Sequence, residues 1–205
     1  MENNQSHDLR RKKRRRRRLQ VALLYVAIAV GLAWFFESQA TTTIIFVRHA
    51  EKDLTVSDDP GLTEAGERRV FELTRQMQGA DVVAGIDAIY STSFKRNIET
   101  VRPLAEVLDL QIHEYNKNEY EQVLDQILDN YKGKIILVVG HSDTLAGLMA
   151  ELGASKSVPE IADNEYDNIY IVSIPWFGKT KTIRLRYGEP YDPDESIRAI
   201  KESED

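Results

Sequence analysis

Apolar positions fall into two different patterns along the chain. The first is an unbroken run from Leu19 to Phe36, which contains no charged residue and one strongly polar side chain, Gln20. Beyond it, short β-branched runs alternate with segments in which apolar residues recur every three or four positions. The first pattern is typical of a membrane-spanning helix, and the second of an α/β domain.

The first run has the length and the flanks of a signal anchor. As a helix, its 18 residues extend about 27 Å, close to the ~30 Å of a hydrocarbon layer. Nine basic residues, Arg10 to Arg18, precede it, and Trp34, Phe35 and Phe36 end it. We therefore expect a basic cytoplasmic tail over 1–18, a transmembrane helix over 19–36, and the domain that follows on the extracytoplasmic side, periplasmic or extracellular.

Two other interpretations of this region stay open. Ser38-Gln39-Ala40 resembles a small-x-small site, so the segment could be a signal cleaved after Ala40. Alternatively, the run is a core helix that follows a solvated or nucleic-acid-binding basic tail. The signal anchor and the cleaved signal both place residues 41–205 outside the cytoplasm, whereas the core helix does not.

The second pattern predicts one domain over 41–187, followed by an acidic tail over 188–205. Apolar runs predict strands at 43–47, 86–90, 111–115, 134–139, 169–174 and 180–186, the last two joined by a turn at Gly178. Helical spacing predicts helices at 64–77, from Arg96 with a restart at Pro103, at 120–131 and at 144–152. Alternating strands and helices indicate a three-layer sandwich with a largely parallel central sheet.

Charge and cysteine content exclude several classes of function. The net charge of -6 combines +7 over residues 1–18 with -13 over the remainder. An acidic body is a poor partner for nucleic acid, so none is expected. With no cysteine, the chain has no disulfide, thiolate metal site or cysteine nucleophile.

Basic side chains and histidines gather where three predicted strands end. Arg48 and His49 follow the first strand, Arg96 follows the second, and His141 follows the strand at 134–139. Ligands of open α/β sheets bind outside the carboxyl ends of the strands. These residues are therefore candidates for one anion-binding site.

Four segments in order resemble the histidine phosphatase superfamily, which has the phosphoglycerate-mutase-like fold. They are Phe46-Val47-Arg48-His49-Ala50-Glu51-Lys52, Leu62-Thr63-Glu64-Ala65-Gly66, Tyr90-Ser91-Thr92-Ser93-Phe94-Lys95-Arg96-Asn97-Ile98-Glu99-Thr100 and Val138-Val139-Gly140-His141-Ser142. The resemblance spans roughly residues 43–186 and is to the small branch without an inserted cap. Ala50 departs from the family, which usually has glycine there.

The resemblance implies that His49 is the nucleophile and forms a phosphohistidine, with Arg48, Arg96 and His141 around the phosphate. A neutral imidazole can attack phosphorus, and this divides hydrolysis into two easier steps. Guanidinium groups suit the equatorial oxygens because they are planar, permanently charged donors, and they should also lower the pKa of His49. A cationic His141 would donate to the same oxygens. No metal or cofactor is required.

The general acid is not identified by any motif. Glu114, near the end of a strand, and Asp143, two residues after His141, are both candidates. If neither acts, we expect a substrate whose leaving group departs easily, such as an acyl phosphate or phosphoramidate. Lys52 either contacts a substrate phosphate or extends into solvent.

These features predict a membrane-anchored phosphatase that hydrolyses phosphomonoesters or related phosphoryl compounds. The stretch between Thr100 and Tyr131 is too short for a lid domain, so we expect an open site and an extended substrate, such as a protein, glycan or lipid phosphate. The alternative is a catalytically silent phosphate-binding module of the same fold, tethered to the membrane.

Overall fold

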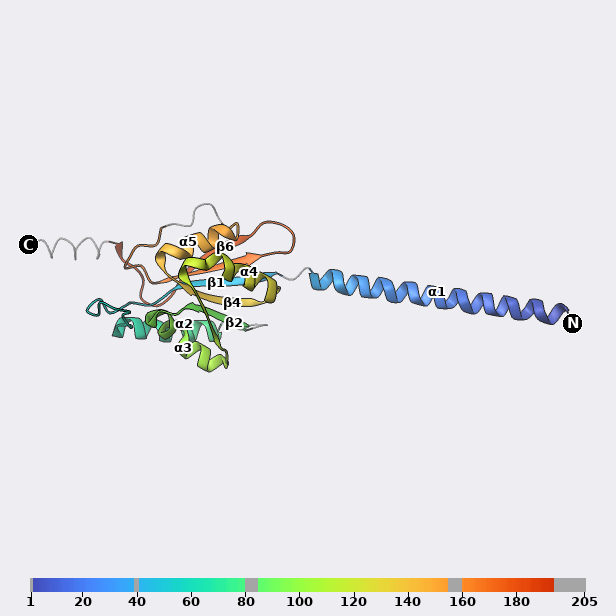
Figure 1. Cartoon of the computed structure of the whole chain (residues 1–205), viewed down its shortest axis with the longest axis horizontal. Coiled ribbons are helices and arrows are strands. Elements are labelled where there is room, and N and C mark those ends of the chain that lie inside the picture. Colours follow the sequence, from blue (N-terminus) through green and yellow to red (C-terminus); the bar gives the residue numbers. More distant parts are fainter. Residues whose placement is uncertain (1, 39–40, 80–84, 155–159, 194–205) are drawn as a thin grey trace, which may run out of the picture. The chain divides into compact units, whose positions relative to one another are not determined.

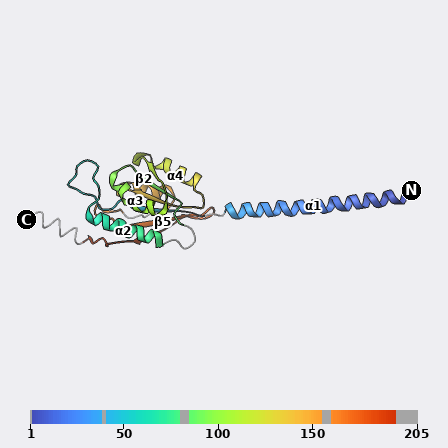
Figure 2. The same cartoon turned by 90° about the horizontal axis from the view of Figure 1, so that it is seen from below.

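The computed structural model describes residues 2–38, 41–79, 85–154 and 160–193 (Figures 1 and 2). The chain divides into two compact units, Met1–Ala40 and Thr41–Asp205. The possible cleavage position after Ala40 and most of the predicted acidic tail lie outside the described residues.

The first unit is one long helix, α1, from Glu2 to Ser38. Within it, Lys12–Phe35 is long and apolar enough to cross a membrane, and it is the one such segment among the described residues. Its large apolar side chains are exposed, Leu23 to 60% and Val26 to 59%. The helix extends through the basic run as well, because lysine and arginine are good helix formers.

The second unit contains a six-stranded mixed sheet. Its strands are β1 (Thr42–Arg48), β2 (Ala88–Thr92), β3 (Ile112–Tyr115), β4 (Ile135–Gly140), β5 (Asn168–Ile174) and β6 (Lys181–Arg186). They lie in the order β3-β2-β4-β1-β5-β6. The first four in this order are parallel, whereas β5 and β6 run antiparallel to β1 and to each other. The predicted α/β class is confirmed.

Helices cover both faces of the sheet and make three layers. One face carries α2 (Glu64–Gly79) and α3 (Lys95–Leu108), which Figure 2 shows side by side. The other carries α4 (Tyr120–Asn130), after a short 3-10 helix at Lys117–Glu119, and α5 (Ser142–Glu151) (Figure 1). Alternate residues of β1 enter the two cores, Ile44 and Phe46 on the α4/α5 side and Ile45 and Val47 on the α2/α3 side. A strand that is buried on both faces has to be continuously apolar.

One local expectation is wrong: α3 does not restart at Pro103 but continues through it. Proline removes one backbone donor and usually breaks a helix. Here Val101 and Leu104, on either side of Pro103, are fully buried in the core. The burial of these side chains offsets the lost hydrogen bond.

The segment that follows β1 packs directly against the start of α2. Thr63 caps the helix, as the sequence predicts: its Oγ1 accepts from Gly66 N at 3.1 Å, and its own N–H donates to Glu51 O at 2.9 Å. A Cβ on Gly66 would lie 2.5 Å from Glu51 O. Only glycine therefore allows α2 to approach this backbone.

We predict that Gly66→Ala lowers the free energy of unfolding by about 1–3 kcal/mol, because the added methyl has to push α2 away from the Glu51 backbone. Urea unfolding followed by circular dichroism measures the change. Gly79→Ala is the matched control, since a Cβ at Gly79 meets nothing within 4 Å. Equal stability of the two variants would contradict the packing argument.

Candidate active site

His49 stands at the carboxyl end of β1, in the first position after the strand. Its N–H donates to Gly140 O at 3.1 Å, which extends the pairing of β1 with β4 by one residue. The side chain is 3% exposed. The imidazole is thus held beneath the protein surface by the same backbone ladder that forms the sheet.

One hydrogen bond sets the tautomer of His49. Nδ1 lies 2.8 Å from Ala50 O, and a carbonyl oxygen can only accept, so Nδ1 carries the proton. In the neutral ring, Nε2 then has the free lone pair. Ala50, which replaces the family's usual glycine, is fully buried, and its N–H donates to Thr100 Oγ1 at 2.9 Å.

His141 lies beside His49, although 92 positions separate them in the sequence. It follows β4 and precedes α5, and its ring centroid is 5.4 Å from that of His49 in an edge-on arrangement. His141 Nε2 and Thr92 Oγ1, at the end of β2, are 3.1 Å apart. The ends of three parallel strands therefore meet at the two histidines, as the sequence predicts.

Arg48 is held by a segment on the other side of β1. Its Nη1 donates to Ala162 O at 2.7 Å and to Glu165 O at 3.0 Å, and its guanidinium lies 4.3 Å from the centroid of the Tyr166 ring. The Tyr166 ring is also 5.9 Å from that of His49. Arg48 Nε is buried and has no hydrogen-bond partner among the described residues.

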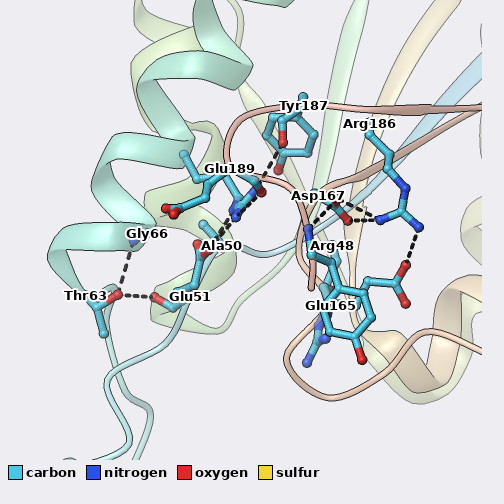
Figure 3. A network of polar contacts seen from close by, with 12 residues as sticks. Arg48, Ala50, Glu51, Thr63, Gly66, Glu165, Asp167, Arg186, Tyr187 and Glu189 are labelled. Atoms are coloured by element: carbon cyan, nitrogen blue, oxygen red, sulfur yellow. Dashed lines mark hydrogen bonds and ion pairs between the residues drawn. The ribbon is translucent and has the colours of Figure 1, made fainter. Parts of the chain in front are cut away.

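Two carboxylates and Arg186 fix the segment that holds Arg48 (Figure 3). Both oxygens of Asp167 accept from Arg186 Nη1 at 2.7 Å, and Glu165 Oε1 accepts from Arg186 Nη2 at 3.2 Å. Asp167 is fully buried and Glu165 is 7% exposed. These ion pairs hold the segment that contains Glu165, whose backbone carbonyl accepts from Arg48. Arg186 therefore supports the position of Arg48 indirectly, through Asp167 and Glu165.

Arg96 reaches the site through aromatic contacts. Its guanidinium lies 4.6 Å from the Phe94 ring, and Phe94 is 5.2 Å from the ring of His141. Asp59 is a distant ion partner, with its Oδ1 3.8 Å from Arg96 Nη1. Arg96 Nε, like that of Arg48, is buried without a hydrogen-bond partner in the part of the chain that the structure describes.

Burial keeps both histidines neutral. It lowers the pKa of His49 to about 3, and the charges of Arg48, His141 and Arg96 act in the same direction, against the hydrogen bond to Ala50 O. It also lowers the pKa of His141 to about 4, again with help from Arg96. Desolvation therefore exceeds the arginine effect that the sequence suggested. Burial therefore favours the neutral form of His141 at neutral pH.

The two candidate acids have different surroundings. Asp143 accepts from Lys117 Nζ at 2.6 Å, and this ion pair holds the pKa of its carboxyl below the usual value. Glu114 is exposed on β3 and lines a groove of about 550 Å³ together with Thr92, Phe94 and Lys117. This groove adjoins the site, because Thr92 and Phe94 both contact His141.

The remaining predicted residue, Lys52, is half-buried and forms an isolated bridge with Leu62 through its backbone. The structure shows no contact between its amino group and the histidine cluster. Glu51 is an ion partner of Arg69 at 2.7 Å, and Arg69 also donates to Tyr187 O at 2.9 Å. Glu51 therefore ties the histidine loop to α2 and to the end of β6.

Sequence reasoning missed Tyr166, Phe94 and Asn97 as neighbours of the site. Asn97 is fully buried, and its side-chain amide lies 3.3 Å from Gly140 O. Phe94 and Asn97 lie within the motif around Arg96, so their position was a usable signal. Tyr166 lies in a polar loop without periodicity, so nothing in the sequence marked it.

The described segment between α3 and α4 holds no inserted domain. Between α3 and α4, residues 109–119 form only β3 and the 3-10 helix. The expectation of an open site does not extend to His49, the predicted nucleophile, which is 3% exposed. Among the described residues, no group of three or more His, Asp or Glu side chains could hold a metal ion.

Comparison with known proteins agrees with this fold. The model of the histidine phosphatase superfamily (branch 1) matches residues 44–119. Comparison with curated protein sequences gives no match. Over residues 44–119 the chain is similar to the histidine phosphatase superfamily.

Solved structures with the same fold are distant in sequence. The protein histidine phosphatase SixA complexed with tungstate is 18% identical, with a TM-score of 0.58 over 70% of this chain and 96% of that one. A putative phosphohistidine phosphatase SixA from Nakamurella multipartitia is 16% identical, with a TM-score of 0.53 over 74% and 98%. A phosphoserine phosphatase from Entamoeba histolytica, in complex with phosphoserine, is 16% identical, with a TM-score of 0.50 over 65% and 94%.

We predict that stability falls as the pH drops below about 6.5. The folded pKa values of His49 and His141, about 3 and about 4, lie below the ordinary value of 6.5. Between these limits the unfolded chain binds protons that the folded chain rejects, at a cost of up to ~1.4 kcal/mol per pH unit for each histidine. Urea unfolding across pH 4–7 measures the slope. Replacing both histidines with asparagine should flatten it, and an unchanged slope would contradict the assignment.

Proposed function

We propose that the chain is a membrane-anchored phosphatase that acts through a phosphohistidine on His49. The observation that carries the proposal is the set of groups around one buried ring. Nδ1 of His49 is held as a donor, which leaves a lone pair on Nε2. Two guanidinium groups nearby have buried Nε–H donors without a partner among the described residues. Unpaired cationic donors in a buried site are costly unless an anion completes them.

In the first step, Nε2 attacks phosphorus in line, a P–N bond forms, and the P–O or P–N bond to the leaving group breaks. Arg48 and Arg96 face the equatorial oxygens, where charge is spread in the transition state. The arriving dianion raises the pKa of His141, which takes up a proton and donates to the same oxygens. In the second step, water attacks phosphorus, the phosphohistidine P–N bond breaks and inorganic phosphate leaves.

The leaving group needs a proton if it is a poor one, and Glu114 is the better placed of the two candidate donors. Asp143 is engaged with Lys117 and ionised. Glu114 faces the groove beside Thr92 and Phe94. We assign Glu114 as the acid for ester substrates; acyl phosphates and phosphoramidates would be cleaved without it.

The anchoring part of the proposal rests on α1. The segment Lys12–Phe35 is apolar and has a basic run at its start. Such cations stay on the cytoplasmic side of a membrane. The phosphatase domain, Thr41–Asp205, then lies outside the cytoplasm and meets its substrate there.

We predict that His49→Ala lowers the hydrolysis of an aryl phosphate by at least about 10³-fold, because no other group replaces the nucleophile. The assay uses purified protein without added metal. Quenching the wild type in alkaline detergent should trap a labelled phosphoprotein that then loses its label in acid. His113→Ala is the control, since His113 is an exposed histidine stacked on Tyr90 at 5.0 Å, outside the site. Retained turnover in His49→Ala would refute the mechanism. A wild type that binds vanadate but never labels would instead be the silent binding module.

We predict that Glu114→Gln slows poor leaving groups far more than good ones. General acids contribute roughly 10²–10⁴-fold when the leaving oxygen needs a proton, and little when it does not. Comparing phenyl with 4-nitrophenyl phosphate measures this difference. Asp143→Asn is the matched control; a larger selective loss in that variant would move the role to Asp143.

A further inference from the structure

The turn between β5 and β6 presents two neighbouring aromatic side chains to solvent. Trp176 is 51% exposed and Phe177 is 84% exposed, with their ring centroids 6.4 Å apart. A domain with two well-filled cores has no packing need for large apolar groups at a loop tip. Clustered exposed apolar side chains mark a contact surface.

The charge around this tip is opposite to that of the domain. Residues 175–184 contain three basic residues and no acidic one, within a body whose net charge is -13. Lys179 and Lys181 follow the aromatic pair directly and are exposed. Aromatic rings beside lysines are the composition of segments that lie in the interface of an anionic membrane.

The β5–β6 turn is held in one conformation by its own contacts. Thr180 Oγ1 donates to Leu152 O at 2.9 Å, which fastens the turn to the end of α5. Gly178 has a φ of 116°, a conformation that L side chains rarely adopt. The turn therefore holds its aromatic pair outward without having to order itself on binding.

Strand register places this turn next to the start of the domain. Ile174, the last residue of β5, pairs with Thr42, the first residue of β1. Thr42 is the seventh residue after Phe35, which ends the apolar segment. Seven residues span at most about 25 Å. If the segment crosses a bilayer, the covalent chain alone keeps the turn near that bilayer's surface.

We propose that Trp176 and Phe177 insert into the interface of the bilayer that the Lys12–Phe35 segment spans, with Lys179 and Lys181 against lipid phosphates. The inference rests on the membrane anchoring proposed above. It adds a second contact to the single covalent connection that the span provides. Two contacts fix the orientation of the domain, whereas one does not.

The second contact determines which phosphates the enzyme reaches. Trp176 and Phe177 lie beside the amino-terminal ends of the parallel strands, near Thr42, whereas His49 follows the carboxyl end of β1, seven residues after Thr42. At about 3.3 Å per residue, the two ends of the strand are roughly 20 Å apart. A docked tip turns His49 away from the bilayer, so its substrates are phosphoryl groups approaching from the aqueous side and not headgroups of the same leaflet.

The two tryptophans of the chain, Trp34 and Trp176, allow a direct test. The full-length Trp34→Phe variant is reconstituted in vesicles of phosphatidylcholine and phosphatidylglycerol, some brominated near the carboxyl end of their acyl chains. Bromine quenches indole fluorescence only at contact range. We expect the emission of Trp176 to be quenched, and to be poorly quenched by aqueous iodide. Emission that iodide quenches and bromolipid does not would overturn the proposal.

Three further variants separate the possible causes. Trp176→Phe leaves Trp34 alone: quenching of Trp34 without quenching of Trp176 refutes the tip contact but keeps the anchor, whereas loss of both refutes the anchor. Adding Phe177→Ser and Lys179→Glu to Trp34→Phe should abolish the quenching of Trp176. Ile183→Ser, on exposed β6 away from the tip, should leave it unchanged. Protection of Trp176 that depends on protein concentration, without bromolipid quenching, would indicate a second copy of the chain and refute the proposal.

Discussion

The parallel pairing of β1 with β4 is the constraint on which the site depends. Arg48 is opposite Gly140 in the register, so the next residue of each strand is a histidine that leaves the sheet at the same level. The hydrogen bond from His49 N to Gly140 O keeps this register for one residue beyond the strand. A slip by one position would turn one of the two rings to the opposite face of the sheet. Strand pairing, rather than any direct bond between the rings, brings the histidines to a centroid distance of 5.4 Å.

Burial then decides the chemistry that the two rings can perform. Nearly complete removal from water, together with neighbouring guanidinium groups, keeps His49 and His141 neutral. For His49, neutrality and a fixed Nδ1 proton are the requirements of a nucleophile. His141 is neutral in the free site, and in the proposed mechanism it takes up a proton when the anionic substrate binds. The cost of holding Arg48 in this low-dielectric region is offset by two backbone carbonyls and the face of Tyr166, which Glu165, Asp167 and Arg186 keep in place.

The two ends of the parallel strands carry different side chains. Histidines and arginines gather at the carboxyl ends. At the amino-terminal ends, the chain enters the domain at Thr42 and the β5–β6 turn exposes an aromatic pair beside two lysines. In our proposals the residues at the carboxyl ends perform phosphoryl transfer, and those at the amino-terminal ends contact the membrane. The length of the strands separates these two surfaces, because parallel strands all begin on one side of the sheet and end on the other.

The sequence by itself determined the alternation of buried strands and amphipathic helices, the apolar segment near the amino terminus, and the likeness of the motifs around His49, Arg96 and His141 to one family. These are local signals: periodicity, capping at Thr63 and residues that follow a strand. Tertiary structure alone decided the continuous course of α3 through Pro103, the place of Tyr166 over Arg48, and the ion pair with Lys117 that distinguishes Asp143 from Glu114. It also showed that burial, more than neighbouring charge, keeps the histidines neutral. Each of these depends on contacts between segments far apart in the chain. The free energy of such a contact depends on both segments, so neither segment's sequence alone predicts it.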